Sequence, residues 1–76
     1  MKKSIHSDKS AQLQELLIKA RINSGLTQKQ LADKLGKPQS FVAKYEGGER
    51  RIDVIEFIEV CQLIGAKAQD IIKKIL

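Results

Sequence analysis

The chain has 76 residues, a length that gives one domain with a small hydrophobic core, near the lower limit for folding without help. Its net charge of +5 at pH 7 suggests a nucleic-acid partner, and its one cysteine, Cys61, excludes an intramolecular disulfide. One histidine, no paired acids and no glycine-rich phosphate loop argue against an enzyme, and no His/Cys cluster offers a metal or cofactor site.

Residues 1–7 show no hydrophobic periodicity and are predicted to form a flexible N-terminal arm in which His6 is exposed to solvent. The single folded domain is predicted over residues 8–76. Its first helix should run from about Asp8 to Ser24 and end at Gly25. The apolar stripe of this helix has helical spacing and consists of Leu13, Leu16, Leu17 and Ala20.

Two short helices joined by a tight turn are predicted over residues 27–46. Thr27 is a good N-cap for the first, and Gln30 can close a capping box with it. Gly36 accepts the left-handed backbone conformation that ends a helix. Pro38 is expected in the first turn of the second helix, where a missing N–H is tolerated. Helices this short must be held against the rest of the domain.

The second of these helices, predicted over residues 38–46, carries side chains suited to reading base edges in a DNA major groove. Gln39 can pair with adenine, and Lys44 can donate to guanine. Ser40 lies one turn before Lys44 on the same face. Phe41 is interpreted as a partial contact to a thymine methyl group, with packing between helices as the alternative.

This stretch resembles the helix-turn-helix of the XRE family, the lambda-repressor-like and Cro-like regulators of phages and bacteria. The residues that carry the resemblance are Gln28, Leu31-Ala32, Gly36, Pro38-Gln39-Ser40, Val42, Lys44-Tyr45-Glu46 and Gly48-Glu49-Arg50-Arg51. The likeness extends from about Leu16 to Gly65 and implies an all-α fold, a compact bundle of about five short helices. It also implies that Arg21 pairs with Glu46, which would tie the first helix to the third and bring Arg21 near a phosphate.

Positive charge is concentrated on residues 19–51, which contain eight basic and three acidic residues, whereas residues 52–76 have a net charge of −1. This one-sided excess coincides with the motif and favours a DNA-binding face over ordinary surface solvation. Gln28 begins a helix, so its amide and the free N–H groups there are predicted to bind a phosphate. The other predicted phosphate ligands are Arg21, Lys29, Lys37, Arg50 and Arg51. Lys37 stands where the family has a capping Ser or Thr.

A fourth helix is predicted to begin after Asp53, with Glu56 closing a second capping box, and to end at Gly65. A last helix is predicted over residues 66–76. The fourth helix is apolar on more than one face and the last helix adds further apolar residues, and this surplus suggests a twofold interface between copies of the chain. The predicted interface residues are Phe57, Cys61, Ile64, Ile71 and Ile75.

The leading hypothesis is a sequence-specific regulator of transcription, a repressor that binds double-stranded DNA as a homodimer on a palindromic operator. Two alternatives use the same fold: an antitoxin that represses its own operon while holding a toxin partner, and a protein-interaction module that does not read DNA. The polar and basic third helix favours DNA over the interaction module. No apolar run reaches membrane-spanning length and no secretion signal is evident, so we expect a cytoplasmic protein without a membrane partner.

Overall fold

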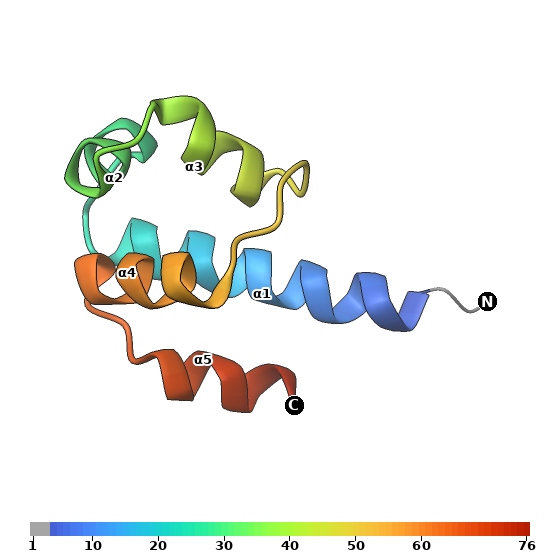
Figure 1. Ribbon diagram of the computed structural model, residues 1–76. Helices are drawn as coiled ribbons and strands as arrows, with labels where there is room; N and C mark the ends of the chain where they lie inside the picture. The colour runs from blue at the N-terminus through green and yellow to red at the C-terminus, as the bar shows by residue number, and fades with distance from the viewer. Residues whose placement is uncertain (1–3) are drawn as a thin grey trace.

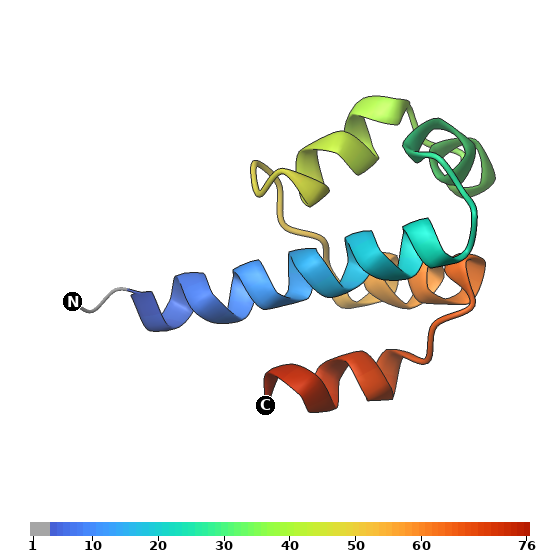
Figure 2. The same cartoon turned by 180° about the vertical axis from the view of Figure 1, so that it is seen from behind.

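The computed structural model describes residues 4–76, with side chains from residue 9 onward, and this part of the chain forms five α-helices and no strands. The helices are α1 (Ser4–Asn23), α2 (Gln28–Leu35), α3 (Gln39–Glu46), α4 (Val54–Ile64) and α5 (Ala68–Ile75). The predicted all-α bundle is therefore confirmed. Helices α1 and α4 lie side by side in the middle of the molecule, with α2 and α3 on one side and α5 on the other (Figures 1 and 2).

The first helix begins at Ser4, earlier than the predicted start at Asp8. Residues 4–7 of the predicted arm continue the helix because they contain no glycine or proline that would interrupt it. The N-terminal turns of α1 extend beyond the other helices (Figure 1). The remainder of the predicted arm, residues 1–3, and the predicted exposure of the His6 side chain lie outside what the structure describes.

The helix-turn-helix has the predicted caps at α2. The Thr27 hydroxyl accepts a hydrogen bond from the Gln30 amide at 3.0 Å, and the Gln30 side chain accepts one from the Thr27 amide at 2.9 Å. Gly36 ends α2 in the left-handed conformation, with φ of 71°. Pro38 lies one position outside α3 rather than in its first turn, because its extended ψ of 156° makes it the N-cap. It offers no side-chain oxygen, so α3 begins without a side-chain cap.

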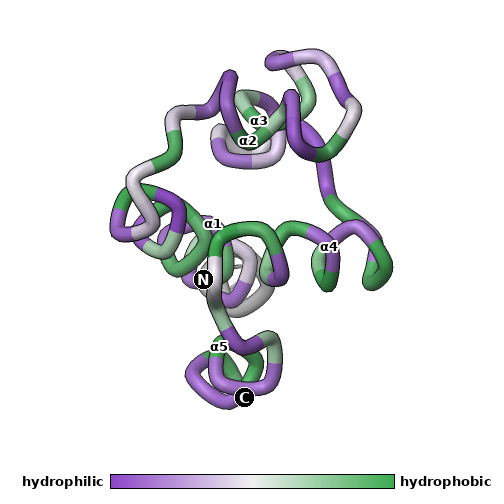
Figure 3. Tube along the Cα trace, turned by 90° about the vertical axis from the view of Figure 1, so that its left-hand side faces the viewer, coloured by the Kyte–Doolittle hydropathy of each residue, from purple (hydrophilic) through white to green (hydrophobic). Residues whose placement is uncertain are grey.

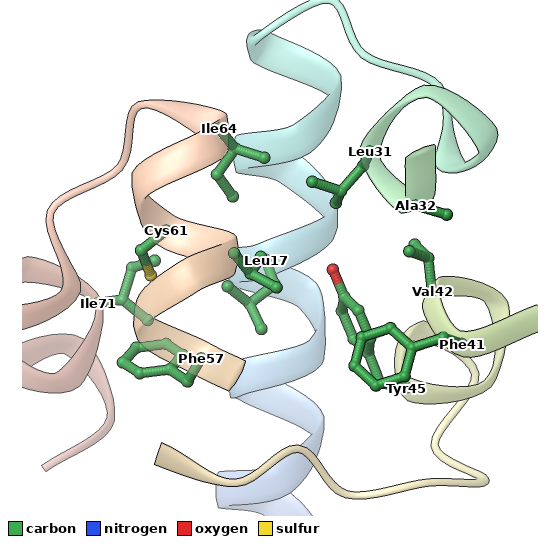
Figure 4. Close-up of a cluster of buried hydrophobic side chains, with 11 residues drawn as sticks. Leu17, Leu31, Ala32, Phe41, Val42, Tyr45, Phe57, Cys61, Ile64 and Ile71 are labelled. Atoms are coloured by element: carbon green, nitrogen blue, oxygen red, sulfur yellow. The ribbon is translucent and has the colours of Figure 1, made fainter. Parts of the chain in front are cut away.

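All five helices contribute side chains to the hydrophobic core, and Figure 4 shows most of them. The buried core residues are Leu17, Leu31, Ala32, Phe41, Val42, Tyr45, Phe57, Val60, Cys61, Ile64 and Ile71. This set contains four of the five residues predicted for the dimer interface: Phe57, Cys61, Ile64 and Ile71. The fifth, Ile75, is half-buried. A domain this small needs these side chains for its own core, so the predicted interface is corrected.

The thiol of Cys61 is fully buried, and this burial raises its pKa. Because the thiolate is the nucleophile that attacks a thiol reagent, modification of the buried Cys61 in the native protein requires opening of the fold. We expect labelling by a thiol reagent to be at least about 100-fold slower in native buffer than in urea. Stoichiometric labelling of the native protein at the unfolded rate would contradict the described packing of α4.

The Tyr45 ring is also part of the core, and its hydroxyl oxygen has no hydrogen-bond partner among the described residues. Burial raises the pKa of this phenol, so it stays neutral. Replacing Tyr45 with phenylalanine removes a hydroxyl that gains no internal hydrogen bond. We expect Tyr45→Phe to leave the free energy of unfolding unchanged or to raise it by about 1 kcal/mol, as measured by urea denaturation. A clear loss of stability would show that the hydroxyl is bonded in the native protein.

Candidate nucleic-acid interface

Helix α3 lies at the outer edge of the molecule beside α2, with one face against the core and the other open to solvent (Figure 1). Gln39, Ser40 and Lys44 are all exposed. Ala43, also exposed, lies one turn after Gln39 and adds no bulk to this face. The three polar side chains predicted to read bases are therefore available to a partner.

Phe41 does not share this exposure, since only 7% of its surface is accessible. Its ring packs edge-on against the ring of Tyr45, with centroids 5.6 Å apart and planes at 71°. Residues four apart on a helix lie on the same side, and Tyr45 belongs to the core. The thymine-methyl contact predicted for Phe41 is accordingly replaced by the alternative, packing between helices.

The carboxylate of Glu46, at the C-terminal end of α3, lies in a network that holds α3 from behind. Arg21 donates from Nε to Oε2 at 2.7 Å and from a terminal nitrogen to Oε1 at 3.1 Å, so the pair that the family resemblance implies is present. Another nitrogen of Arg21 donates to the carbonyl oxygen of Leu26 at 2.9 Å. The Arg21 side chain is 13% exposed and that of Glu46 is 5% exposed. This burial leaves little of the Arg21 guanidinium for the phosphate contact that had been predicted.

Gln28 supplies a third donor to this carboxylate, from Nε2 to Oε1 of Glu46 at 2.9 Å. Sequence reasoning placed the Gln28 amide on a phosphate and missed this bond. The pairing of Glu46 with Arg21 could have indicated this bond, because a buried carboxylate requires more hydrogen-bond donors than one edge of a guanidinium provides. The backbone N–H groups of Gln28 and Lys29, which begin α2, have no intrahelical acceptor and still suit a phosphate.

The remaining predicted phosphate ligands differ in how many contacts their side chains make within the protein. Lys37 and Arg51 are exposed, and Lys29 is exposed with its ammonium 3.6 Å from the Asp33 carboxylate. An exposed pair of this kind contributes little to stability and leaves Lys29 able to turn to a phosphate. Arg50 is also exposed, but its guanidinium contacts Glu56, the Arg51 carbonyl oxygen and the Phe41 ring.

Comparison with known proteins agrees with this geometry. Residues 17–71 match the helix-turn-helix family HTH_3. A solved structure, an XRE-family like protein from Pseudomonas syringae pv. tomato str. DC3000, superposes with a TM-score of 0.90 at 48% sequence identity. That match covers 96% of this chain and 89% of the other. The chain belongs to the XRE family of helix-turn-helix proteins. The comparison with curated proteins gives no match.

Membership of the XRE family places this chain among DNA-binding regulators of transcription. Its helix-turn-helix consists of α2, the turn after it and α3. In the part of the XRE-family chain that is described, no helix is long and apolar enough to cross a membrane. Within the described residues, no group of three or more His, Cys, Asp or Glu side chains could hold a metal ion.

Proposed function

We propose that this XRE-family protein is a repressor that binds double-stranded DNA as a homodimer, with α3 of each copy in the major groove of one half of a palindromic operator. The observation that carries the proposal is the orientation of α3. The buried Arg21–Glu46–Gln28 network and the core hold its inner side, while Gln39, Ser40 and Lys44 remain exposed on its outer side. An exposed face with amide, hydroxyl and ammonium groups is suited to base edges.

Contacts to the DNA phosphates would be made on either side of this face. The exposed Lys29, Lys37 and Arg51 lie before, between and after the two helices of the motif. Together with the N-terminus of α2, these residues can hold the phosphates on both sides of the groove. Affinity should therefore fall steeply with salt, by a factor set by the number of phosphates neutralised.

A different apolar surface from the one predicted supports the homodimer. On α4, the solvent-facing residues Val54, Ile55 and Ile58 fall within about 100° of the helix circumference. Val54 and Ile72 of α5 line one small cavity of about 160 Å³, so these two exposed residues of α4 and α5 are neighbours. Figure 3 shows hydrophobic residues on the side of α4 that lies away from α1. We define Val54, Ile55, Ile58 and Ile72 as the α4–α5 patch and propose it as the dimer interface.

Selection of bound sequences from a random DNA library tests the proposal directly. The expected result is a palindrome whose half-sites are about one helical turn, roughly 34 Å, apart. Failure to enrich any sequence at moderate salt, with non-specific binding only, would contradict sequence-specific regulation.

Two substitutions then separate base reading from phosphate binding. We expect Lys44→Ala to relax the preference at one base position of each half-site and to cost about 1–3 kcal/mol of binding free energy. Arg51→Ala should weaken binding to all sequences about equally and lower the slope of log affinity against log salt by about 0.9 per phosphate lost. Gel shifts on the selected site and its single-base variants provide both readouts. If both variants change only overall affinity, the base-reading role of Lys44 is wrong.

A further inference from the structure

We propose that Arg50 is a positioning residue, which fixes the loop after α3 and the first turn of α3, and that it is not a phosphate ligand. The proposal rests on the DNA-binding function proposed above, because the position of this loop decides where Arg51 meets DNA. The contacts that support it, however, are all within the protein and do not involve DNA.

The guanidinium of Arg50 is bonded to the chain on two sides. It donates to both carboxylate oxygens of Glu56, at 3.3 Å and 3.1 Å, and one of its terminal nitrogens donates to the carbonyl oxygen of Arg51 at 2.6 Å. Glu56 is itself fixed, because the Asp53 amide donates to its carboxylate at 2.9 Å in the capping box of α4. Arg50 is thereby attached to the rigid N-terminal end of α4 and holds the peptide group that carries Arg51.

The same guanidinium lies against the recognition helix. Its central carbon is 4.7 Å from the centroid of the Phe41 ring, within cation–π range. Phe41 belongs to the first turn of α3 and is next to Ser40 in sequence. Because Phe41 is buried on the inner side of α3, its packing influences how that helix is rotated toward the DNA. Arg50 thus links the first turn of α3 to the first turn of α4.

Two chemical arguments favour positioning over phosphate binding. A planar guanidinium can form a two-pronged contact with a carboxylate while it covers an aromatic ring. A lysine ammonium can lie over a ring, as that of Lys37 does 5.3 Å from the centroid of Phe41, but it cannot form the two-pronged contact. The charge of Arg50 is, moreover, already balanced by Glu56. Both arginines are exposed, but a phosphate would have to compete with that carboxylate for Arg50, whereas Arg51 has only its carbonyl engaged.

The test compares Arg50→Lys, Arg50→Gln, Glu56→Gln and the double variant Arg50→Gln/Glu56→Gln, with Arg51→Gln as the matched control. Glutamine at position 56 preserves the capping box, as Gln30 does in α2, but removes the ion pair. Affinity for the selected operator is measured across a salt series, at a temperature where circular dichroism shows every variant folded.

Positioning predicts that Arg50→Lys and Arg50→Gln each weaken binding about 10-fold without changing the salt slope. Glu56→Gln should weaken binding to a similar extent, although it removes a negative charge, and the double variant should be no worse than either single one. Arg51→Gln alone should lower the slope. If instead Arg50→Lys binds normally, Arg50→Gln lowers the slope and Glu56→Gln tightens binding, Arg50 is a phosphate ligand and the proposal fails.

A second measurement does not depend on DNA. The backbone amides of Glu49 and Arg50 donate to the Lys44 carbonyl oxygen at 2.9 Å and 3.2 Å, so they report the order of the loop. In free protein, Arg50→Lys should speed hydrogen exchange at these amides, whereas Arg51→Gln should not. Unchanged exchange in Arg50→Lys would overturn the positioning role, whereas absence of DNA binding by the wild-type protein would overturn only the proposed function.

Discussion

Replacing Glu46 with alanine is expected to lower the free energy of unfolding by about 3–5 kcal/mol, which is comparable with the whole stability of a domain of this size. The carboxylate is buried and accepts from Arg21 and Gln28. Its removal leaves the partly buried guanidinium of Arg21 and the amide of Gln28 without their carboxylate, and a charge that loses its partner in a largely desolvated site is strongly destabilising. Urea denaturation followed by circular dichroism measures the loss.

Glu49→Ala is the matched control, because Glu49 is an exposed glutamate only three positions further along the chain. It should change stability by less than about 0.5 kcal/mol. Glu46→Gln retains the size of the side chain and should lie between wild type and Glu46→Ala. If Glu46→Ala lost no more stability than Glu49→Ala, the network would not be what holds α3 in place.

Placing a charge in the α4–α5 patch is expected to convert the proposed homodimer into a monomer. Ile55→Asp introduces a carboxylate that an interface would have to bury without a partner. The side chain is 63% exposed in a single copy, so the fold itself should be little affected. Because the proposed operator would bind two linked copies of α3, loss of the dimer should reduce operator affinity by about 100-fold or more. Analytical ultracentrifugation and gel shifts give the two readouts.

Ile22→Asp provides the control, since Ile22 is 59% exposed but lies on α1, outside the patch. It carries the same chemical change at the same degree of exposure, and we expect it to remain dimeric and to bind the operator normally. The proposed interface is wrong if the Ile55→Asp variant stays dimeric, or if the Ile22→Asp variant dissociates to the same extent.

The elements that could be predicted from sequence are those with local causes. The capping boxes at Thr27 and Asp53 and the left-handed glycines that end α2 and α4 depend on residues within one helical turn, so they could be read directly. The start of α1 was placed too late because Ser4, Ser7 and Asp8 are all residue types that can cap a helix, so the sequence offers more than one start.

What could not be predicted depends on which elements pack together. Helix α4 is apolar on more than one side, and periodicity cannot tell which side meets the core and which remains exposed. Phe57 and Cys61 were therefore assigned to an interface, although they complete the interior, and Ile55 and Ile58 were not. Arg50 lies in a loop without any period, and its partners Phe41 and Glu56 come from two different helices.

The Glu46 network has a consequence for how this protein could change its target. Arg21, Gln28 and Glu46 come from three different helices and meet behind α3, so α3 is fastened without help from Gln39, Ser40 or Lys44. Under the proposed function, this means that new DNA-sequence preferences can be installed at those three positions while the framework stays intact. Moving the motif into another protein should fail. A transplanted fragment that starts at Thr27 does not contain Arg21, so it would lose the contact that fixes the orientation of α3.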